Sequence, residues 1–197
     1  MAPTAVSSWQ QAVDELLGRL AEGSRLVLID GPSGSGKSTL ATLLHQRASQ
    51  AEPATRLVRL DDVYPGWDGL ADGAREVAED LVAPLAAGRA GRYRRYDWAA
   101  GMKTDAIEIE PGVPVIVEGV GALHPLSTPL ASGRAWVTAA PRERRRRALN
   151  RDGDTYRPHW DRWAAQETAF YADTRPAARA DLVLNTTRTR ILEAPDD

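Results

Sequence analysis

Residues 26–40 read LVLIDGPSGSGKSTL. Four apolar residues lead into a glycine-rich turn, and the turn leads into a segment that favours helix. Gly31, Gly36, Lys37 and Ser38 fit the spacing G-x-x-x-x-G-K-[ST]. The stretch therefore predicts a strand, a phosphate-binding loop and a helix, in that order.

The chemistry of this loop follows from its residue types. Glycines let the backbone bend so that its N–H groups and the helix N-terminus surround the β-phosphate of a nucleotide. Lys37 would place a compact positive charge on the β- and γ-phosphates during catalysis, and the Ser38 hydroxyl would be a magnesium ligand. We expect the nucleotide site to consist of Gly31, Ser33, Gly34, Ser35, Gly36, Lys37, Ser38 and Thr39.

Composition limits the class of protein. A chain of 197 residues with 43% hydrophobic content is enough for one domain, residues 1–197, with a real core. A formal charge of −2 argues against a general binder of nucleic acid polymers. The chain has no cysteine, which excludes disulfides, thiolate metal sites and a cysteine nucleophile and fits a reducing cytosol. Without a long apolar run or a leader, a soluble cytoplasmic protein with no membrane partner is expected.

Strands and helices alternate along the rest of the chain. The sequence predicts an α/β fold with a mainly parallel sheet. The last six or so residues look disordered. Helices are expected from Ser7 or Ser8 to about 21, at 38–49, at 72–87 with a kink at Pro84, from Pro141, and at 159–171. Strands are expected at 25–29, 55–60, 113–118, 135–138 and 180–184. A hairpin is expected at about 91–110.

Acidic residues end two of these strands. Asp61 and Asp62 follow the strand at 55–60, and Glu118 ends the strand at 113–118. The carboxyl ends of parallel strands form the edge at which ligands bind in such folds. Glu118 is therefore expected to be a magnesium ligand, directly or through water, and Asp61, in preference to Asp62, to be the functional aspartate.

The same aspartates bear on the group that would accept a phosphoryl group. A hydroxyl acceptor needs a carboxylate to take its proton, whereas an acceptor that is already a phosphate needs positive charge. Two aspartates at this edge favour an uncharged alcohol. Arg92, Arg94 and Arg95 leave the phosphate alternative open, because they could supply a phosphate site from the hairpin.

An arginine-rich segment, residues 141–160, is predicted to be a small lid. Arg144, Arg147 and Arg151 fall on one face of a helix that could close over a triphosphate, although a solvated arginine face is the alternative. Four tryptophans in or beside predicted loops could stack on a planar ring or simply cover the core; these are Trp67, Trp98, Trp160 and Trp163.

Several motifs resemble those of the uridine kinase, phosphoribulokinase and pantothenate kinase group of P-loop kinases. GPSGSGKST is similar to the G-x-S-x-SGK-[ST] loop of that group, and VIVEGVGAL resembles its strand with the metal-associated glutamate, here Glu118. RLDDVY resembles the segment whose first aspartate is the general base, here Asp61. RRALNRDG looks like the start of the lid, which implies catalytic roles for Arg147 and Arg151.

The resemblance also implies where the acceptor binds. Residues 96–98, YDW, are similar to a YDF segment that contacts the acceptor in this group. Uridine kinases follow YDF with a Thr-His pair that helps to read the pyrimidine, whereas Ala99-Ala100-Gly101 follows here. The expected acceptor-binding residues are Asp62, Tyr64, Trp67, Tyr96, Asp97 and Trp98.

Taken together, the motifs predict a three-layer P-loop kinase fold and an enzyme that uses ATP and Mg²⁺ to phosphorylate a small-molecule alcohol. A nucleoside such as uridine or cytidine is the first candidate for the acceptor. The alternatives are a nucleoside monophosphate kinase and a nucleotide-binding switch or NTPase with no small-molecule acceptor. The chain has no N-K-x-D motif of the kind that reads guanine in switches.

Overall fold

A computed structural model describes residues 3–187 of the chain. Its centre is a six-stranded sheet with the order β1-β8-β7-β2-β6-β3, in which every pairing is parallel. The predicted α/β fold with a mainly parallel sheet is therefore confirmed. The strands are β1 Thr4–Val6, β2 Leu26–Asp30, β3 Arg56–Arg59, β6 Val115–Glu118, β7 Gly133–Thr138 and β8 Leu182–Asn185.

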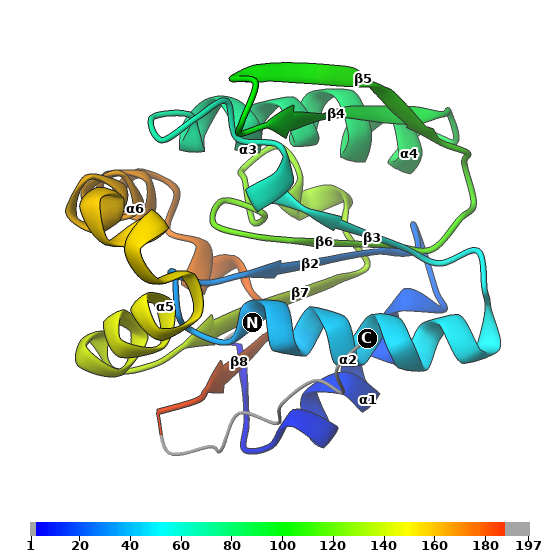
Figure 1. The fold of residues 1–197 in the computed structure, drawn as a ribbon. Helices are drawn as coiled ribbons and strands as arrows, with labels where there is room; N and C mark the ends of the chain where they lie inside the picture. Colours follow the sequence, from blue (N-terminus) through cyan, green and yellow to red (C-terminus); the bar gives the residue numbers. More distant parts are fainter. Residues whose placement is uncertain (1–2, 188–197) are drawn as a thin grey trace.

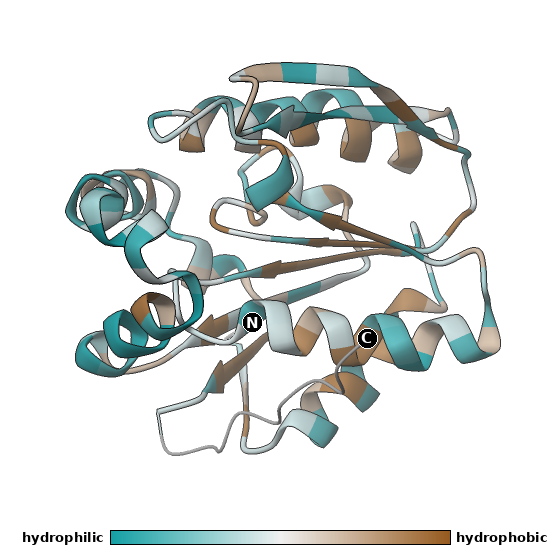
Figure 2. Ribbon diagram, viewed as in Figure 1, coloured by the Kyte–Doolittle hydropathy of each residue, from teal (hydrophilic) through white to brown (hydrophobic). Residues whose placement is uncertain are grey.

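The central strand β2 shows why the sheet is covered on both faces. All five of its residues are buried, and successive side chains point to opposite faces of a sheet. Leu26 and Leu28 belong to one hydrophobic cluster, whereas Val27 and Ile29 belong to the other. Figure 2 shows the resulting band of hydrophobic strands in the middle of the molecule. A strand buried on both faces reads as a continuous apolar run, which is the pattern in residues 26–29.

Helices form the two outer layers of the fold. Helices α1 (Trp9–Leu20) and α2 (Lys37–Ala51) pack on one face, and α1 begins after a Ser8 side chain that accepts the Gln11 N–H. The opposite face is covered by α3 (Leu70–Glu76), α4 (Ala83–Ala86) and α6 (Trp160–Thr174). Helices α5 (Pro141–Tyr156) and α6 lie at the side to which the strand arrows point (Figure 1).

The helix predicted at 72–87 is present, but it contains a π-helical segment in place of the expected kink at Pro84. A π-helical segment, Val77–Val82, joins α3 to α4. Pro84 has no N–H, and its ring would clash with the carbonyl of Asp80 in a regular α-helix. The wider turns just before Pro84 relieve that clash, so the chain continues in helical form to Ala86.

Other elements follow the predictions within a few residues. The hairpin consists of β4 (Gly91–Asp97) and β5 (Met102–Ile109), paired antiparallel above α3 and α4 (Figure 1). Strand β1 was not predicted, because three residues are too few to show a periodic pattern. The expected disorder of the last six or so residues falls outside the described part of the chain. Within residues 3–187, no helix has the length and apolar character needed to cross a bilayer.

Candidate active site

The loop between β2 and α2 has the backbone that its glycines predict. Gly34 has φ +76°, and a Cβ atom added there would lie 2.1 Å from the carbonyl oxygen of Arg144 in α5. At Gly31 an added Cβ would lie 2.1 Å from the Val137 carbonyl oxygen. Only glycine fits at these two positions, since the loop runs against the backbone of α5 on one side and of β7 on the other.

A cavity of about 300 Å³ lies between this loop and the arginine-rich helix α5. The side chain of Lys37, the first residue of α2, is almost fully buried, with 4% of its surface exposed. A buried ammonium beside a helix N-terminus is suited to an anionic ligand. The cavity is lined by Gly34, Gly36, Lys37, Ser38, Thr39, Arg146, Arg147, Ala148, Asn150 and Arg151.

Glu118 ends β6 beside the loop and is 1% exposed. The Ser38 hydroxyl donates a hydrogen bond of 3.3 Å to its Oε2. Its Oε1 accepts no hydrogen bond from the described residues, and Arg59 Nε lies 3.6 Å away as an ion-pair partner. Burial raises the pKa of Glu118 to about 7, whereas the nearby charge of Lys37 lowers the pKa.

This pair of oxygens fits a magnesium ion. A carboxylate and a serine hydroxyl are hard oxygen ligands of the kind that Mg²⁺ binds, and the Glu118 Oε1 without a hydrogen bond has a free coordination position. No cluster of three or more acidic, histidine or cysteine side chains in residues 3–187 could hold a metal by itself. An ion held here would need phosphate and water oxygens to complete its coordination.

Asp61 and Asp62 lie in a 3₁₀ turn, Leu60–Asp62, directly after β3. Strand β3 ends at Arg59, one residue earlier than predicted. Asp61 lines a second cavity, of about 530 Å³, and Asp62 does not. The lining residues of this aromatic-walled cavity are Ser33, Asp61, Tyr64, Trp67, Trp98, Arg151, Asp152, Thr155, Tyr156, His159 and Trp163.

Stacked rings form one wall of this second cavity. Trp67 stacks on His159 with ring centroids 4.2 Å apart and on Tyr156 with centroids 5.6 Å apart. The Trp98 ring lies 4.9 Å from Trp67, and its indole N–H donates to the Asp61 carbonyl oxygen over 3.2 Å. Trp67, from a predicted loop, and Trp98, from the predicted hairpin, therefore meet beside Asp61.

The remaining residues expected at the acceptor site have other contacts. Tyr64 lines the cavity, but its hydroxyl donates to the Val120 carbonyl oxygen over 2.7 Å. Tyr96 packs edge-on against Trp98 and is not part of the lining. The Asp97 carboxylate accepts the N–H groups of Ala99 and Ala100, both at 2.9 Å, so this side chain stabilises the turn of the hairpin.

The three arginines predicted to share one face of the lid are held in different ways. Arg144 donates to the Ser33 carbonyl oxygen, and Arg147 donates to both the hydroxyl and the carbonyl oxygen of Thr186. The Arg151 side chain pairs with the adjacent Asp152 and is 54% exposed. It lines both the loop cavity and the aromatic-walled cavity. Of these three arginines, Arg151 is thus the one that lies where the two cavities meet.

Two buried carboxylates beside the loop were not predicted from the sequence. Asp30, at the end of β2, accepts hydrogen bonds from the N–H groups of Gly31, Gly121 and Leu123 and from the Tyr171 hydroxyl. Glu167, in α6, accepts the Ser33 N–H over 2.9 Å. Asp30 had a visible signal, a charged residue after a fully apolar strand. Glu167 had none, because its partner is 134 positions away in sequence.

Asp30 should make stability depend on pH. Burial raises its pKa from the usual 3.8 to about 6, so its protonated form is favoured in the folded state. The protonated Asp30 carboxyl therefore makes its full contribution to the free energy of unfolding below about pH 4. This contribution is lost as pH rises through 6, a change of about 3 kcal/mol. We expect the free energy of unfolding of the wild type, minus that of Asp30→Asn, to be larger at pH 4 than at pH 7 in urea titrations. An equal difference at both pH values would contradict this assignment.

The fold and the loop define the class of protein. A parallel α/β sheet whose central strand runs into G-x-x-x-x-G-K-S and a helix is the fold of P-loop kinases, as the resemblance in the motifs predicts. The chain belongs to the AAA domain family, whose family model matches residues 27–167. No curated protein matches the chain significantly.

Solved structures support the same fold. A possible uridine kinase from Bacillus stearothermophilus superposes with a TM-score of 0.61 at 19% sequence identity, over 89% of this chain and 98% of the other. A candidate fructose transport system kinase from Silicibacter sp. TM1040 superposes with a TM-score of 0.53 at 23% identity and the same coverage. These similarities extend along nearly the whole length of both relatives and establish the P-loop kinase fold for this chain.

Proposed function

We propose that this protein is an ATP- and magnesium-dependent kinase that transfers the γ-phosphoryl group to the hydroxyl of a small molecule. The observation that carries the proposal is the meeting of two cavities at Arg151. One cavity is lined by the phosphate loop, and the other has Asp61 in an aromatic wall. A phosphotransferase needs this pairing of a donor site with an acceptor site, and residues 1–197 would form one such domain with a lid at about 141–160.

The donor half of the reaction depends on charge and position. The loop N–H groups and the Lys37 ammonium would hold the β- and γ-phosphates, and Ser38 and Glu118 would hold Mg²⁺. When bound, the ion neutralises negative charge on the phosphate oxygens. Arg151 would offset the charge that develops on the transferring group, since it lines both cavities.

The acceptor half depends on Asp61. Its carboxylate would take the proton of the acceptor hydroxyl as the oxygen attacks phosphorus. A phosphorylated acceptor is disfavoured, because the cavity contains the carboxylates of Asp61 and Asp152, and its one arginine, Arg151, already pairs with Asp152. In the aromatic wall the Trp98 ring is 43% exposed and suits a flat acceptor, which supports a nucleoside as the first candidate.

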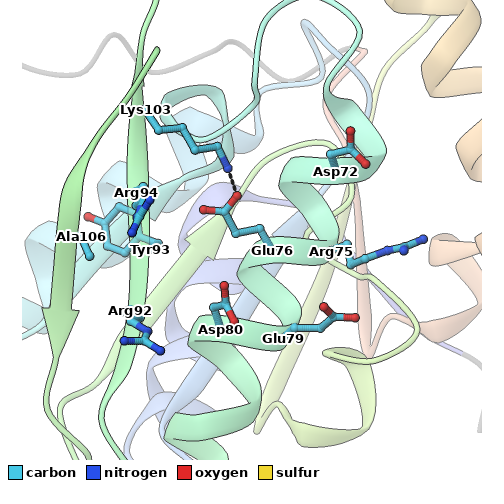
Figure 3. Close-up of a pocket in the computed structure, with 10 residues that line it drawn as sticks. All are labelled: Asp72, Arg75, Glu76, Glu79, Asp80, Arg92, Tyr93, Arg94, Lys103 and Ala106. Atoms are coloured by element: carbon cyan, nitrogen blue, oxygen red, sulfur yellow. Dashed lines mark hydrogen bonds and ion pairs between the residues drawn. The ribbon is translucent and has the colours of Figure 1, made fainter.

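The hairpin arginines bear on the rival function, a nucleoside monophosphate kinase. Arg92 and Arg94 line a separate groove between the hairpin and the helical stretch formed by α3 and the π-helical segment, where Lys103 pairs with Glu76 (Figure 3). The helical side of that groove carries four carboxylates, Asp72, Glu76, Glu79 and Asp80. Neither arginine lines the aromatic-walled cavity, so neither supplies the positive charge that a phosphate acceptor would need there.

The direct test is the release of ADP from ATP in the presence of candidate acceptors. Wild-type protein would be incubated with ATP, Mg²⁺ and single members of a panel of nucleosides, their monophosphates and other small alcohols, and products would be identified by mass spectrometry. We expect ADP release to depend on an uncharged alcohol. ADP release that is the same whatever alcohol is present would favour an NTPase or switch instead.

A cytoplasmic location is part of the proposal and rests on the absence of cysteine.

Glu118→Gln should weaken the apparent affinity for magnesium. The change removes the charge but keeps the shape of a side chain that the Ser38 hydroxyl contacts. We expect a higher magnesium concentration at half-maximal rate and a turnover lowered roughly tenfold or more, as for loss of a metal ligand or its support. A magnesium titration of ADP release measures both. If neither value changes, Glu118 has only a structural role.

Arg151→Ala should lower turnover far more than it lowers nucleotide affinity. An interaction made only in the transition state changes kcat, whereas uniform binding changes affinity as well. Arg145→Ala is the matched control, since Arg145 lies on the same helix and lines neither cavity. Equal losses of turnover and nucleotide affinity in Arg151→Ala would assign this residue to ground-state binding.

A further inference from the structure

Ser33, in the phosphate loop, has all of its polar groups bound by residues outside the loop. Its N–H donates to Glu167 Oε1 over 2.9 Å, and its carbonyl oxygen accepts from Arg144 Nη1 over 3.2 Å. Its hydroxyl accepts from the Tyr156 hydroxyl over 3.1 Å. Three residues from α5 and α6 thus hold one residue of the loop, which is 8% exposed.

Glu167 is the most constrained member of this set. It is a carboxylate 4% exposed, and its Oε1 also accepts the indole N–H of Trp163 over 3.1 Å. Its Oε2 lies 3.7 Å from Arg144 Nη1, the same nitrogen that donates to Ser33. Burying a carboxylate is costly unless it is paired and hydrogen-bonded. The Glu167 carboxylate is satisfied by the Ser33 N–H of the loop, by the Trp163 indole N–H and by Arg144, which also binds the loop.

The contacts on Ser33 bear directly on the loop amides. A peptide bond is planar and trans, so the Ser33 carbonyl and the Gly34 N–H point in opposite directions. Holding that carbonyl against Arg144 therefore fixes the direction of the Gly34 N–H. The Arg144 carbonyl oxygen also occupies the space beside Gly34 that a Cβ would need. Loop amides bind phosphate well only if they are already oriented.

We propose that Glu167, with Arg144 and Tyr156, is a positioning residue that fixes the Ser33–Gly34 peptide in the orientation that binds the phosphates of the nucleotide. Glu167 does not line the loop cavity or the aromatic-walled cavity, so it acts through Ser33. The inference rests on the proposed nucleotide site. It assigns part of the nucleotide affinity to α6, an element that the loop motif does not include.

The test measures binding of a fluorescent ADP derivative, mant-ADP, with magnesium and without any acceptor. We expect Glu167→Ala to weaken binding by about tenfold or more, as for loss of a hydrogen bond to a charged group. Glu167→Gln keeps a carbonyl oxygen for the Ser33 N–H, so its affinity should lie between those of Glu167→Ala and the wild type. Tyr156→Phe loses one neutral hydrogen bond and should weaken binding about threefold to tenfold.

Two controls separate positioning from general destabilisation. Asp173→Asn changes an exposed acid on the same helix, and Val13→Ala lowers stability from the core beside α1. Both should bind mant-ADP as the wild type does. An equal loss of affinity in Val13→Ala would overturn the proposal, as would wild-type affinity in a folded Glu167→Ala. If Glu167→Ala does not fold, wild-type affinity in both Glu167→Gln and Tyr156→Phe would overturn it.

The outcome is distinguishable from failure of the proposed function. Wild-type protein that binds mant-ADP through Glu167 but phosphorylates no alcohol would leave the positioning role in place and refute the kinase assignment. Wild-type protein that does not bind mant-ADP would refute both.

Discussion

Lys37→Ala is expected to remove γ-phosphoryl transfer while the protein remains folded. The ammonium is 4% exposed at the start of α2, beside the cavity that the loop forms with α5. A fixed positive charge in a site that excludes water stabilises charge developing on the phosphates, and losing one such group typically costs roughly 10²–10³ in kcat. We expect at least that loss in acceptor-dependent ADP release.

The chain supplies a matched control for this change. Lys103 is its only other lysine, and it pairs with Glu76 in the groove beside the hairpin (Figure 3). Lys103→Ala removes the same charge and should leave turnover near that of the wild type. Unfolding followed by circular dichroism would check that both variants are folded. Wild-type turnover in Lys37→Ala would contradict the assignment of the loop to phosphate binding.

Asp61→Asn is expected to lower turnover by roughly 10²–10⁴, the usual contribution of a general base. Asp61 lines the aromatic-walled cavity, and the amide that replaces its carboxylate cannot take a proton from a hydroxyl. Affinity for mant-ADP should change little, because Asp61 does not line the loop cavity. Steady-state kinetics with a saturating alcohol acceptor would separate these two effects.

Asp62→Asn is the control for position within the same turn. Asp62 does not line the cavity, so its replacement should be the milder change. Faster phosphorylation of a monophosphate than of its parent alcohol, with Asp61→Asn still active, would overturn both the base assignment and the proposed acceptor class. Turnover that depends on Asp62 and not on Asp61 would keep the mechanism and move the base by one residue.

The sequence predicted most of the fold because its signals are local. The apolar run at 26–29, the glycines after it and Lys37 specify strand, loop and helix within fifteen residues. The parallel sheet followed from the alternation of strands and helices. The π-helical segment before Pro84 could not be predicted from such local signals. A proline predicts that a helix is distorted, but it does not predict whether the distortion is a kink or a π-helical turn.

The proposed acceptor site was harder to predict than the loop. From the sequence, Trp67 and Trp98 could cover the core or form the wall of a pocket. Their contact with each other beside Asp61, in the lining of the aromatic-walled cavity, favours the pocket wall. Asp97 was an acceptor candidate from its motif, whereas its carboxylate accepts the N–H groups of the hairpin turn. Arg92 and Arg94 could have supplied a phosphate site, but the hairpin places them in a groove with the carboxylates of α3 and of the π-helical segment that follows it.

The sequence by itself determined the phosphate loop, the strand before it and the class of fold, because neighbouring residues set backbone conformation and hydrophobic period. Only the tertiary structure decided which distant side chains surround that loop. Glu167 reaches Ser33 across 134 positions, and Arg151 lies where two cavities meet. Such contacts depend on how α5 and α6 pack at the carboxyl ends of the strands, and no local pattern in the chain encodes that packing.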